Sequence, residues 1–188
     1  VNSNYSVEIS DLAQSCYDTI TVFIDTLAPN AIPVSNLNVY LNNVGQATAS
    51  ATDANSATTD NCGLGSFSLS NTIFACSDLG SNTVMFYATD NNSNIDSASM
   101  TITVIDTVSP IVATQNISIY LDANGAASIT TTDIDNGSSD NCAIASMTVL
   151  PNTFTCANIN SNTVTLTVTD GSGNVSTGTA TVAVLDNI

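Results

Sequence analysis

Acidic side chains are the only charged groups that this chain carries. Its 188 residues include 16 Asp and Glu but no Lys, Arg or His, so the formal net charge is −16. No side-chain cation can therefore neutralise a carboxylate. Carboxylates that lie close together can be neutralised by a metal ion, and Ca²⁺ is the hard cation that prefers oxygen ligands. Alternatively, such carboxylates cap turns by accepting hydrogen bonds from backbone N–H groups.

Two matching stretches of the sequence place acidic and amide residues in the same three segments: a linker, a first loop and a later loop. In an immunoglobulin-type sandwich these segments meet at the end where the chain enters. Like charges held so closely are costly unless a cation joins them. We predict one structural Ca²⁺ at each entrance; the alternative is that these residues only cap turns. The candidate ligands are Asp25, Asp53, Asn55, Asp60, Asp90 and Asn94, and then Asp106, Asp133, Asp135, Asp140, Asp170 and Asn174.

The composition excludes several classes of function. Without cations the chain cannot neutralise phosphates, which excludes nucleic-acid binding. Attraction to an anionic membrane fails for the same reason, and no hydrophobic run approaches the ~20 residues that span a bilayer. A Ser-His-Asp or Cys-His nucleophile has no base, and no Lys can form a Schiff base.

One pair of carboxylates resembles the acid and base of a glycosidase. The pair is Asp133 with Asp140, and it recurs as Asp53 with Asp60. Two active sites in adjacent modules of this size would be unusual, so the recurrence indicates a scaffold role. We predict that the chain is not an enzyme.

The cysteines indicate the cellular compartment. The separation between Cys62 and Cys76 along the chain is the same as that between Cys142 and Cys156. This repeated spacing predicts one disulfide inside each repeat, Cys62–Cys76 and Cys142–Cys156, each worth about 3 kcal/mol. A zinc site is the alternative, but two cysteines in each repeat and no His are too few ligands for it. Disulfides place the protein outside the cytosol. Cys16 either has a partner upstream of the given sequence or is a free buried thiol.

The sequence is a tandem repeat. Cys62 and Cys142 occupy matching positions, and TTDNCGL and SNTVMFYATD in the first repeat match SSDNCAI and SNTVTLTVTD in the second. We expect the chain to be a fragment of a longer array. The predicted divisions are residues 1–24, the last strands of a preceding module; 25–105, a first module; 106–185, a second module; and 186–188, the start of a following linker.

Hydrophobic residues alternate with polar ones in a period of two. Val164, Leu166 and Val168 alternate with threonines, which is typical of a half-buried antiparallel strand. The Asn-Gly pair near Asp122 predicts a tight turn. About seven short strands per repeat, with turn signals every 8–12 residues, indicate a sandwich. We predict an all-β fold: tandem immunoglobulin-like β-sandwich modules arranged as a rod.

Some Thr and Ser residues follow an Asp and precede a small apolar residue. This pattern resembles the O-glycosylation acceptor of Bacteroidota, and two of its occurrences lie at equivalent linker positions. The candidate glycosylation residues are Thr19, Thr26, Ser97 and Thr107.

The strings DTVSP, NISIYLDANGAASITTTDIDNGSSDNC and TVTLTVTDGSGNVSTGTATVAVLD are similar to HYR-like (hyalin-repeat) modules of giant bacterial surface proteins. The similarity is greatest to gliding-motility adhesins of the SprB type in Bacteroidota. It implies a secreted, filamentous, cell-surface protein that adheres to substrata and leaves the cell through the type IX secretion system. Many such modules have two further cysteines where this chain has Thr114 and Gly178, so that second disulfide is not expected here.

These observations lead to one expected function. We expect a structural repeat segment of a secreted cell-surface adhesin or filament, a stiff extracellular spacer for gliding motility or attachment. Its partners would be neighbouring modules of the same chain and a surface polysaccharide or substratum. The alternative is an array of carbohydrate-binding modules. It is disfavoured because Trp is absent and aromatic residues are 5 % of the chain, which leaves few flat platforms for sugar stacking.

Overall fold

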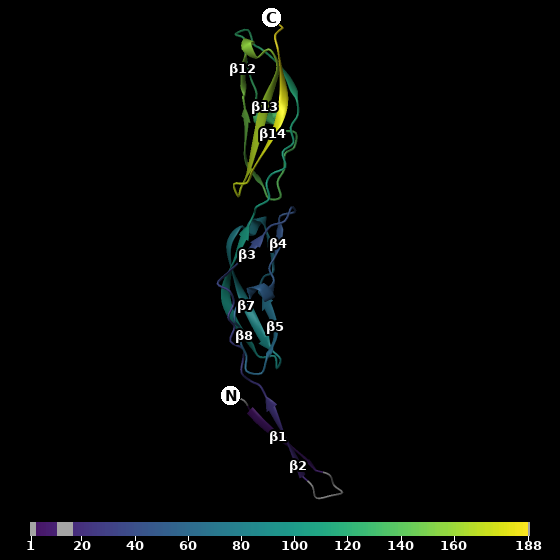
Figure 1. Cartoon of the computed structure of the whole chain (residues 1–188), viewed down its shortest axis with the longest axis vertical. Coiled ribbons are helices and arrows are strands. Elements are labelled where there is room, and N and C mark those ends of the chain that lie inside the picture. The colour runs from purple at the N-terminus through teal and green to yellow at the C-terminus, as the bar shows by residue number, and fades with distance from the viewer. Residues whose placement is uncertain (1–2, 11–16, 188) are drawn as a thin grey trace. The chain divides into compact units, whose positions relative to one another are not determined.

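The fold comes from a computed structural model that describes residues 3–10 and 17–187; Cys16 lies outside this range. The chain begins with an antiparallel pair of strands, β1 (Ser3–Ser10) and β2 (Tyr17–Ile24), in which Ser3 faces Ile24 (Figure 1). The described residues then divide into two compact units, within 1–39 and 47–105 and within 40–46 and 106–187.

The strands of the first repeat form one four-stranded sheet and one two-stranded sheet. The order in the larger sheet is β3-β8-β7-β5, and β4 pairs with β6 in the smaller one. The elements are β3 (Asn36–Tyr40), β4 (Gln46–Thr48), α1 (Ala51–Ala54), β5 (Leu64–Leu69), β6 (Ile73–Ala75), the 3₁₀ turn η1 (Cys76–Asp78), β7 (Gly80–Asp90) and β8 (Ile95–Ile105).

The second repeat has the same elements in the same order. Its larger sheet has the order β11-β13-β14-β9, in which β14 and β9 are parallel, and β10 pairs with β12. The elements are β9 (Ile117–Tyr120), β10 (Ala126–Ser128), α2 (Thr131–Ile134), β11 (Ile144–Leu150), β12 (Thr153–Thr155), η2 (Cys156–Asn158), β13 (Asn160–Asp170) and β14 (Val175–Leu185).

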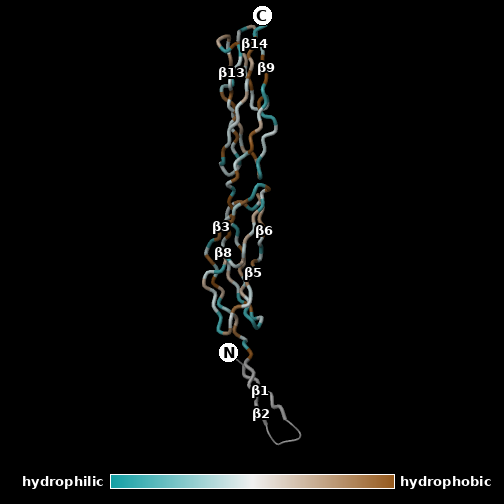
Figure 2. Tube along the Cα trace, turned by 45° about the vertical axis from the view of Figure 1, so that its right-hand side comes forward, coloured by the Kyte–Doolittle hydropathy of each residue, from teal (hydrophilic) through white to brown (hydrophobic). Residues whose placement is uncertain are grey.

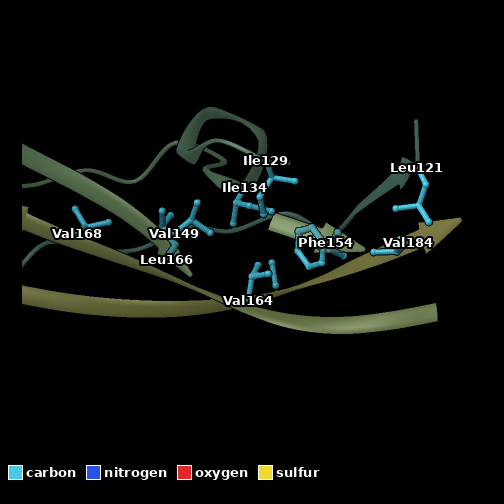
Figure 3. Close-up of a cluster of buried hydrophobic side chains, with 11 residues drawn as sticks. Leu121, Ile129, Ile134, Val149, Phe154, Val164, Leu166, Val168 and Val184 are labelled. Atoms are coloured by element: carbon cyan, nitrogen blue, oxygen red, sulfur yellow. The ribbon is translucent and has the colours of Figure 1, made fainter. Parts of the chain in front are cut away.

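The core of the second unit lies between its two layers (Figure 3). Val164, Leu166 and Val168 of β13 are fully buried, as the period of two predicts. They face Phe154 of β12 and Ile134 of α2 in the other layer. Figure 2 shows hydrophobic and hydrophilic residues interspersed along the trace of this unit. The buried cluster consists of Leu121, Ile129, Ile134, Val149, Phe154, Val164, Leu166, Val168, Ala180, Val182 and Val184.

The prediction of an all-β sandwich fold is confirmed, with two differences in detail. Each repeat has six strands rather than about seven. A further segment only forms isolated bridges, Asn30 with Thr59 and Pro33 with Asn55 in the first repeat. The one-turn helices α1 and α2 were not predicted, because four residues are too few to show a helical period.

The predicted turn after Asp122 is present. Gly125 has a φ of +71°, and the Asp122 carboxylate accepts hydrogen bonds from the backbone N–H groups of Asn124 and Ala126, both at 2.9 Å. The turn joins β9 to β10, which belong to different sheets. It therefore carries the chain from one layer of the sandwich to the other.

The predicted disulfides Cys62–Cys76 and Cys142–Cys156 are wrong. Cys76 and Cys142 are disulfide-bonded, whereas Cys62 and Cys156 carry free, exposed thiols. The repeated spacing is real, but spacing along the chain does not reveal how far apart the chain carries two residues.

The length of β7 explains why the pairs inside a repeat do not form. Cys62 lies close before Leu64, which faces Asp90 at the end of β7, and Cys76 lies close before Gly80, where β7 begins. β7 has 11 residues, and an extended strand rises about 3.3 Å per residue. The two cysteines are thus at opposite ends of a strand far longer than the Cα separation of ~4.4–6.8 Å that a disulfide requires.

Among the described residues, no helix has the length and apolar character needed to cross a membrane.

Candidate metal centre

Three carboxylates meet in the first unit. Asp25, Asp60 and Asp90 each offer one oxygen, and these three oxygens lie within 4.8 Å of one another. Asp25 follows the last residue of β2, Asp60 lies between α1 and β5, and Asp90 ends β7. Asp25 and Asp90 are only 5 % and 4 % exposed, and Asp60 is half-buried. The linker and the two loops thus meet at one end, as the sequence predicts.

The second unit repeats this arrangement with equivalent residues. Asp106, Asp140 and Asp170 also offer oxygens within 4.8 Å of one another. Asp106 and Asp170 are 5 % and 2 % exposed. We call these two sets of three carboxylates the first and the second acidic cluster.

The residue that ends the long strand is fixed by its own turn. In the first cluster, Oδ1 of Asp90 accepts hydrogen bonds from the backbone N–H groups of Asn92 and Asn94, both at 2.8 Å. In the second cluster, Oδ1 of Asp170 accepts from Ser172 at 2.9 Å and from Asn174 at 2.8 Å. An Asp side chain that binds the backbone two residues further on forms such turns readily.

The loop residue is fixed in the same way. Oδ2 of Asp60 accepts from the N–H groups of Cys62 at 2.7 Å and Gly63 at 2.9 Å. Oδ2 of Asp140 accepts from the N–H of Cys142 at 2.9 Å. In each case the second carboxylate oxygen, Oδ1, is left for other partners.

The linker residue uses only one of its oxygens as well. Oδ1 of Asp25 accepts from the N–H of Leu27 at 3.1 Å and from Nδ2 of Asn61 at 3.2 Å. Oδ1 of Asp106 accepts from Val108 at 3.0 Å and from Nδ2 of Asn141 at 3.1 Å. The bonds fix the position of each carboxylate while its Oδ2 remains unused.

Four carboxylate oxygens in these clusters are buried without any hydrogen-bond partner. They are Oδ2 of Asp25 and Oδ1 of Asp60 in the first cluster, and Oδ2 of Asp106 and Oδ1 of Asp140 in the second. A buried acceptor left unsatisfied costs about 1–3 kcal/mol, and more when it is charged. The same pair of equivalent atoms is unsatisfied in both repeats, so the arrangement is a built feature of the fold.

Hydrogen bonds favour the charged form of Asp25 and Asp170. The hydrogen bond from the Leu27 N–H lowers the pKa of Asp25 and, with help from Asn61, outweighs the opposing effect of burial. Burial tends to raise the pKa of Asp170, but the hydrogen bonds from Asn174 and Ser172 outweigh it, and the pKa is lowered. Both residues are therefore negatively charged at neutral pH.

The structure does not bring all twelve predicted ligands together. Asp53 and Asp133 lie in the one-turn helices α1 and α2, and both are exposed. Asp133 caps its helix, since its Oδ2 accepts from the N–H and the hydroxyl of Thr130, both at 2.7 Å. These two residues lie outside the acidic clusters. In each repeat the chain forms a helical turn, α1 or α2, in the segment after β4 or β10, and this turn holds the aspartate away from the cluster.

Asn55 and Asp135 bind their own loop instead. Oδ1 of Asn55 accepts from the N–H of Thr58 at 3.3 Å. Oδ1 of Asp135 accepts from the N–H of Ser138 at 3.0 Å, and the Ser138 hydrogen bonds lower the pKa of Asp135. For these residues the turn-capping alternative describes the structure.

Asn94 and Asn174 lie beside the clusters, but as donors. Nδ2 of Asn94 donates to Oδ2 of Asp90 at 2.8 Å and to the backbone carbonyl of Asp25 at 3.1 Å. Nδ2 of Asn174 donates to Oδ2 of Asp170 at 2.8 Å. These amides position the carboxylates.

The sequence analysis missed one pair of equivalent residues, Asn61 and Asn141. Asn61 donates to Asp25, and Asn141 donates to Asp106, so each fixes the linker carboxylate. The signal was present, because the string Asp-Asn-Cys occurs in both repeats at the same position.

The candidate glycosylation residues are placed in different elements. Thr26 and Thr107 each follow the linker aspartate of a cluster and are exposed, as is Ser97 in β8. Thr19 lies in β2, and its side chain is outside what the structure describes.

In comparisons with known proteins, the chain is similar only to solved structures. No family model and no curated protein matches the chain. The Drosophila N-cadherin EC1-4 structure is 13 % identical, with a TM-score of 0.44, and the match covers 92 % of this chain and 52 % of that one. For protocadherin gamma B7 extracellular cadherin domains 1-4 the identity is 11 %, the TM-score 0.40 and the coverage 99 % and 58 %. This chain thus spans little more than half of either structure. Human mucin-like protocadherin EC1-2 is 11 % identical, with a TM-score of 0.40 and coverage of 85 % and 98 %. At these values the similarity says nothing about function, which rests on the residues of this chain.

Proposed function

We propose that each acidic cluster binds one structural Ca²⁺, held by Asp25, Asp60 and Asp90 in the first repeat and by Asp106, Asp140 and Asp170 in the second. The observation that carries this proposal is the set of buried carboxylate oxygens that have no hydrogen-bond partner. Three carboxylates within 4.8 Å, in a chain without Lys, Arg or His, have no cation of their own. Carboxylate oxygens are the ligands that Ca²⁺ prefers.

The role of such an ion would be mechanical. Asp106 directly follows Ile105, the last residue of β8, in the sequence. An ion that joins Asp106 to Asp140 and Asp170 would fix the start of the second repeat to two of its own loops, and so restrict the backbone where the repeats connect. We propose that the chain is a structural repeat segment of a secreted cell-surface adhesin or filament, in which it acts as a stiff spacer.

Several observations support this function. The disulfide-bonded cysteines fit an extracellular location, and the HYR-like resemblance implies a bacterial surface protein of the gliding-motility type. Attachment to a surface polysaccharide or a substratum would belong to other parts of such a protein. The chain without Lys or Arg also offers no cleavage site to trypsin-like proteases.

Calorimetric titration of Ca²⁺ into chelator-stripped full chain tests the metal sites. We expect two equivalents of heat-producing binding. At a free Ca²⁺ concentration 100 times Kd, each repeat should gain about 2.7 kcal/mol of stability. Asp60→Asn should remove one equivalent and Asp140→Asn the other. Asp53→Asn is the matched control, because Asp53 is exposed and lies outside the cluster. No heat and no change in melting temperature on adding Ca²⁺ would refute the sites.

Nuclear magnetic resonance relaxation tests the spacer role separately. If Ca²⁺ stiffens the connection, backbone amides of the two repeats, measured in reductant so that no disulfide contributes, should report independent tumbling in chelator and joint tumbling in Ca²⁺. Independent tumbling in both conditions would leave two calcium sites but no spacer function.

Intact-mass measurement of the protein from its native source would show whether Thr26 or Thr107 carries a glycan.

A further inference from the structure

The dipeptide Asn-Gly occurs twice in the sequence, and both copies lie in the second repeat. Asn124 and Gly125 belong to the turn between β9 and β10, and Asn136 and Gly137 belong to the loop between α2 and β11. Glycine has no side chain to obstruct its own backbone nitrogen, so this nitrogen can reach the side-chain carbonyl carbon of a preceding asparagine. An Asn-Gly pair is therefore prone to lose its side-chain amide spontaneously, provided that its backbone is free to move.

The turn between β9 and β10 protects the first pair. The backbone N–H of Gly125 donates to the carbonyl of Asp122 at 2.8 Å, and the N–H of Asn124 donates to Oδ1 of Asp122 at 2.9 Å. A Cβ built on Gly125 would lie 2.6 Å from Sγ of Cys156, so this glycine is closely packed. The nitrogen that would have to attack is thus already engaged in a hydrogen bond, and the backbone around it is fixed.

The second pair lies in an open part of its loop. Asn136 and Gly137 are both exposed, and a Cβ built on Gly137 would meet nothing within 4 Å. The nitrogen of Gly137 is 3.4 Å from Oδ2 of Asp135, which is beyond the ~2.7–3.2 Å of an ordinary N–H···O hydrogen bond. This nitrogen is therefore only weakly held, and the space around the pair leaves room for it to attack the asparagine.

We propose that Asn136 is a site of spontaneous deamidation, whereas Asn124 in the same repeat is protected. The backbone nitrogen of Gly137 loses its proton to water and bonds to Cγ of Asn136. The bond from Cγ to Nδ2 breaks, and Nδ2 takes up a proton and leaves as ammonia. Water then opens the resulting succinimide ring. Opening at one carbonyl gives aspartate, and opening at the other gives isoaspartate, in which the main chain runs through the former side chain.

The loop around Asn136 holds the segment of chain that leads into β9. The N–H of Asn136 donates to the carbonyl of Ala113 at 2.9 Å, and an isolated bridge lies on either side of this bond. The two bridges are Thr114 with Asp135 and Ile111 with Ser139. An isoaspartate adds one main-chain carbon between the bridges and so strains their register, whereas an aspartate leaves the main chain unchanged. Formation of isoaspartate should therefore loosen this attachment.

Incubation of the full chain at mildly alkaline pH tests the site, in chelator so that the outcome does not depend on the proposed calcium sites. An Asp-directed protease, needed because the chain has no Lys or Arg, releases the two asparagines on separate peptides, residues 122–132 and 135–139. Mass spectrometry then follows the exchange of an amide for an acid; the protease also cuts before a new aspartate but not before an isoaspartate. Asn136 should convert about ten times faster than Asn124, because freeing the Gly125 N–H costs a hydrogen bond.

Two variants separate the site from its effect on the loop. Asn136→Ser is the matched control, because Ser56 stands at the equivalent place in the first repeat; it should abolish conversion there and leave Asn124 unchanged. Asn136→Asp mimics the aspartate product and should melt like the parent, whereas aged parent rich in isoaspartate should melt several degrees lower. Equal conversion of Asn136 and Asn124, or none at Asn136, would overturn the proposed site. Isoaspartate-rich protein that melts like fresh protein would overturn its effect on the loop.

Discussion

Asn94 donates a hydrogen bond of 2.8 Å through Nδ2 to Oδ2 of Asp90, and the same nitrogen reaches the backbone carbonyl of Asp25 at 3.1 Å. One amide thus ties the turn that ends β7 to the incoming chain. Asn174 makes the equivalent bond to Asp170 at 2.8 Å. In a cluster without cations, these amide N–H groups are the protein's own means of compensating negative charge beside the proposed ion.

Asn94→Asp should therefore change stability in opposite directions with and without metal. In chelator, a fourth carboxylate replaces two donated hydrogen bonds, so the melting temperature should fall by several degrees. With Ca²⁺ the added charge should raise affinity, by about tenfold, because carboxylate count tunes such sites. Calorimetric titration and thermal melts measure both effects.

Asn92→Asp is the control for this prediction. It adds the same charge to the same turn, but Asn92 is exposed and contributes only its backbone N–H to Asp90. Equal effects of the two substitutions would contradict the prediction, because they would show that the side-chain hydrogen bonds of Asn94 do not matter to the cluster.

The helix cap in the second repeat predicts an asymmetry between two equivalent aspartates. Oδ2 of Asp133 accepts from both the N–H and the hydroxyl of Thr130 at 2.7 Å, which completes a capping box at α2 that α1 does not have. Asp133→Ala should cost about 1 kcal/mol of unfolding free energy, the usual value of a lost cap. Asp53→Ala should stay within about 0.5 kcal/mol, as for surface substitutions away from such features. Urea unfolding in chelator measures both, and equal losses would contradict the asymmetry.

The strands were predictable from sequence because their signal is local. Val164, Leu166 and Val168 alternate with threonines, and a period of two is a direct consequence of strand geometry. The meeting of Asp106, Asp140 and Asp170 was also predictable, because the sandwich topology brings linker and loops to one end.

The ligand set and the cysteine pairing were not predictable in the same way. Asp133 and Asp140 belong to one loop, but the helical turn α2 directs the first into a cap and leaves the second for the cluster. Cys62 and Cys76 are near each other in sequence, yet they lie at opposite ends of β7. Both errors come from the path that a loop takes in space, which residue spacing alone does not determine.

The turn after β9 predicts a pH dependence that one substitution should remove. Backbone hydrogen bonds from Ala126 and Asn124 lower the pKa of Asp122. Because the folded pKa lies below the unfolded one, this carboxylate stabilises the fold above the unfolded pKa of about 3.9 and loses that effect as pH falls through the folded pKa. Asn42 makes equivalent bonds in the first repeat, to the N–H groups of Val44 at 3.0 Å and Gln46 at 3.1 Å.

Asp122→Asn should therefore keep the turn and abolish its titration. The stability difference between parent and variant should increase from pH 2 to pH 5 and then stay constant, as measured by urea unfolding at each pH. Asp122→Ala is the control that removes the acceptor, and it should be less stable than Asp122→Asn at every pH. A parent–variant difference that does not vary with pH would show that Asp122 titrates alike in both states.

The structure also predicts that a second disulfide can be introduced where the resembling modules have two cysteines. A Cβ placed on Gly178 would lie 3.1 Å from Cγ2 of Thr114, and the Thr114 hydroxyl donates to the carbonyl of Thr179 at 2.8 Å. A cysteine Sγ at position 114 would thus be within reach of one at 178. The Cβ at 178 would also lie 2.8 Å from Cγ1 of Val112, so Gly178→Cys alone should lose about 1–3 kcal/mol through overpacking.

The double variant Thr114→Cys with Gly178→Cys should form the bond and regain stability. Closing a loop of this length stabilises by about 4 kcal/mol on the chain-entropy model, which exceeds the overpacking cost, so the oxidised variant should melt above the parent and the reduced one below it. Thr114→Cys alone is the control, because it adds a thiol at the same place while position 178 keeps its glycine. Thermal melts with and without reductant, with mass spectrometry of the linked peptides, measure the effect. If residues 114 and 178 stayed as free thiols under oxidation, the close approach of the linker segment to β14 would be wrong.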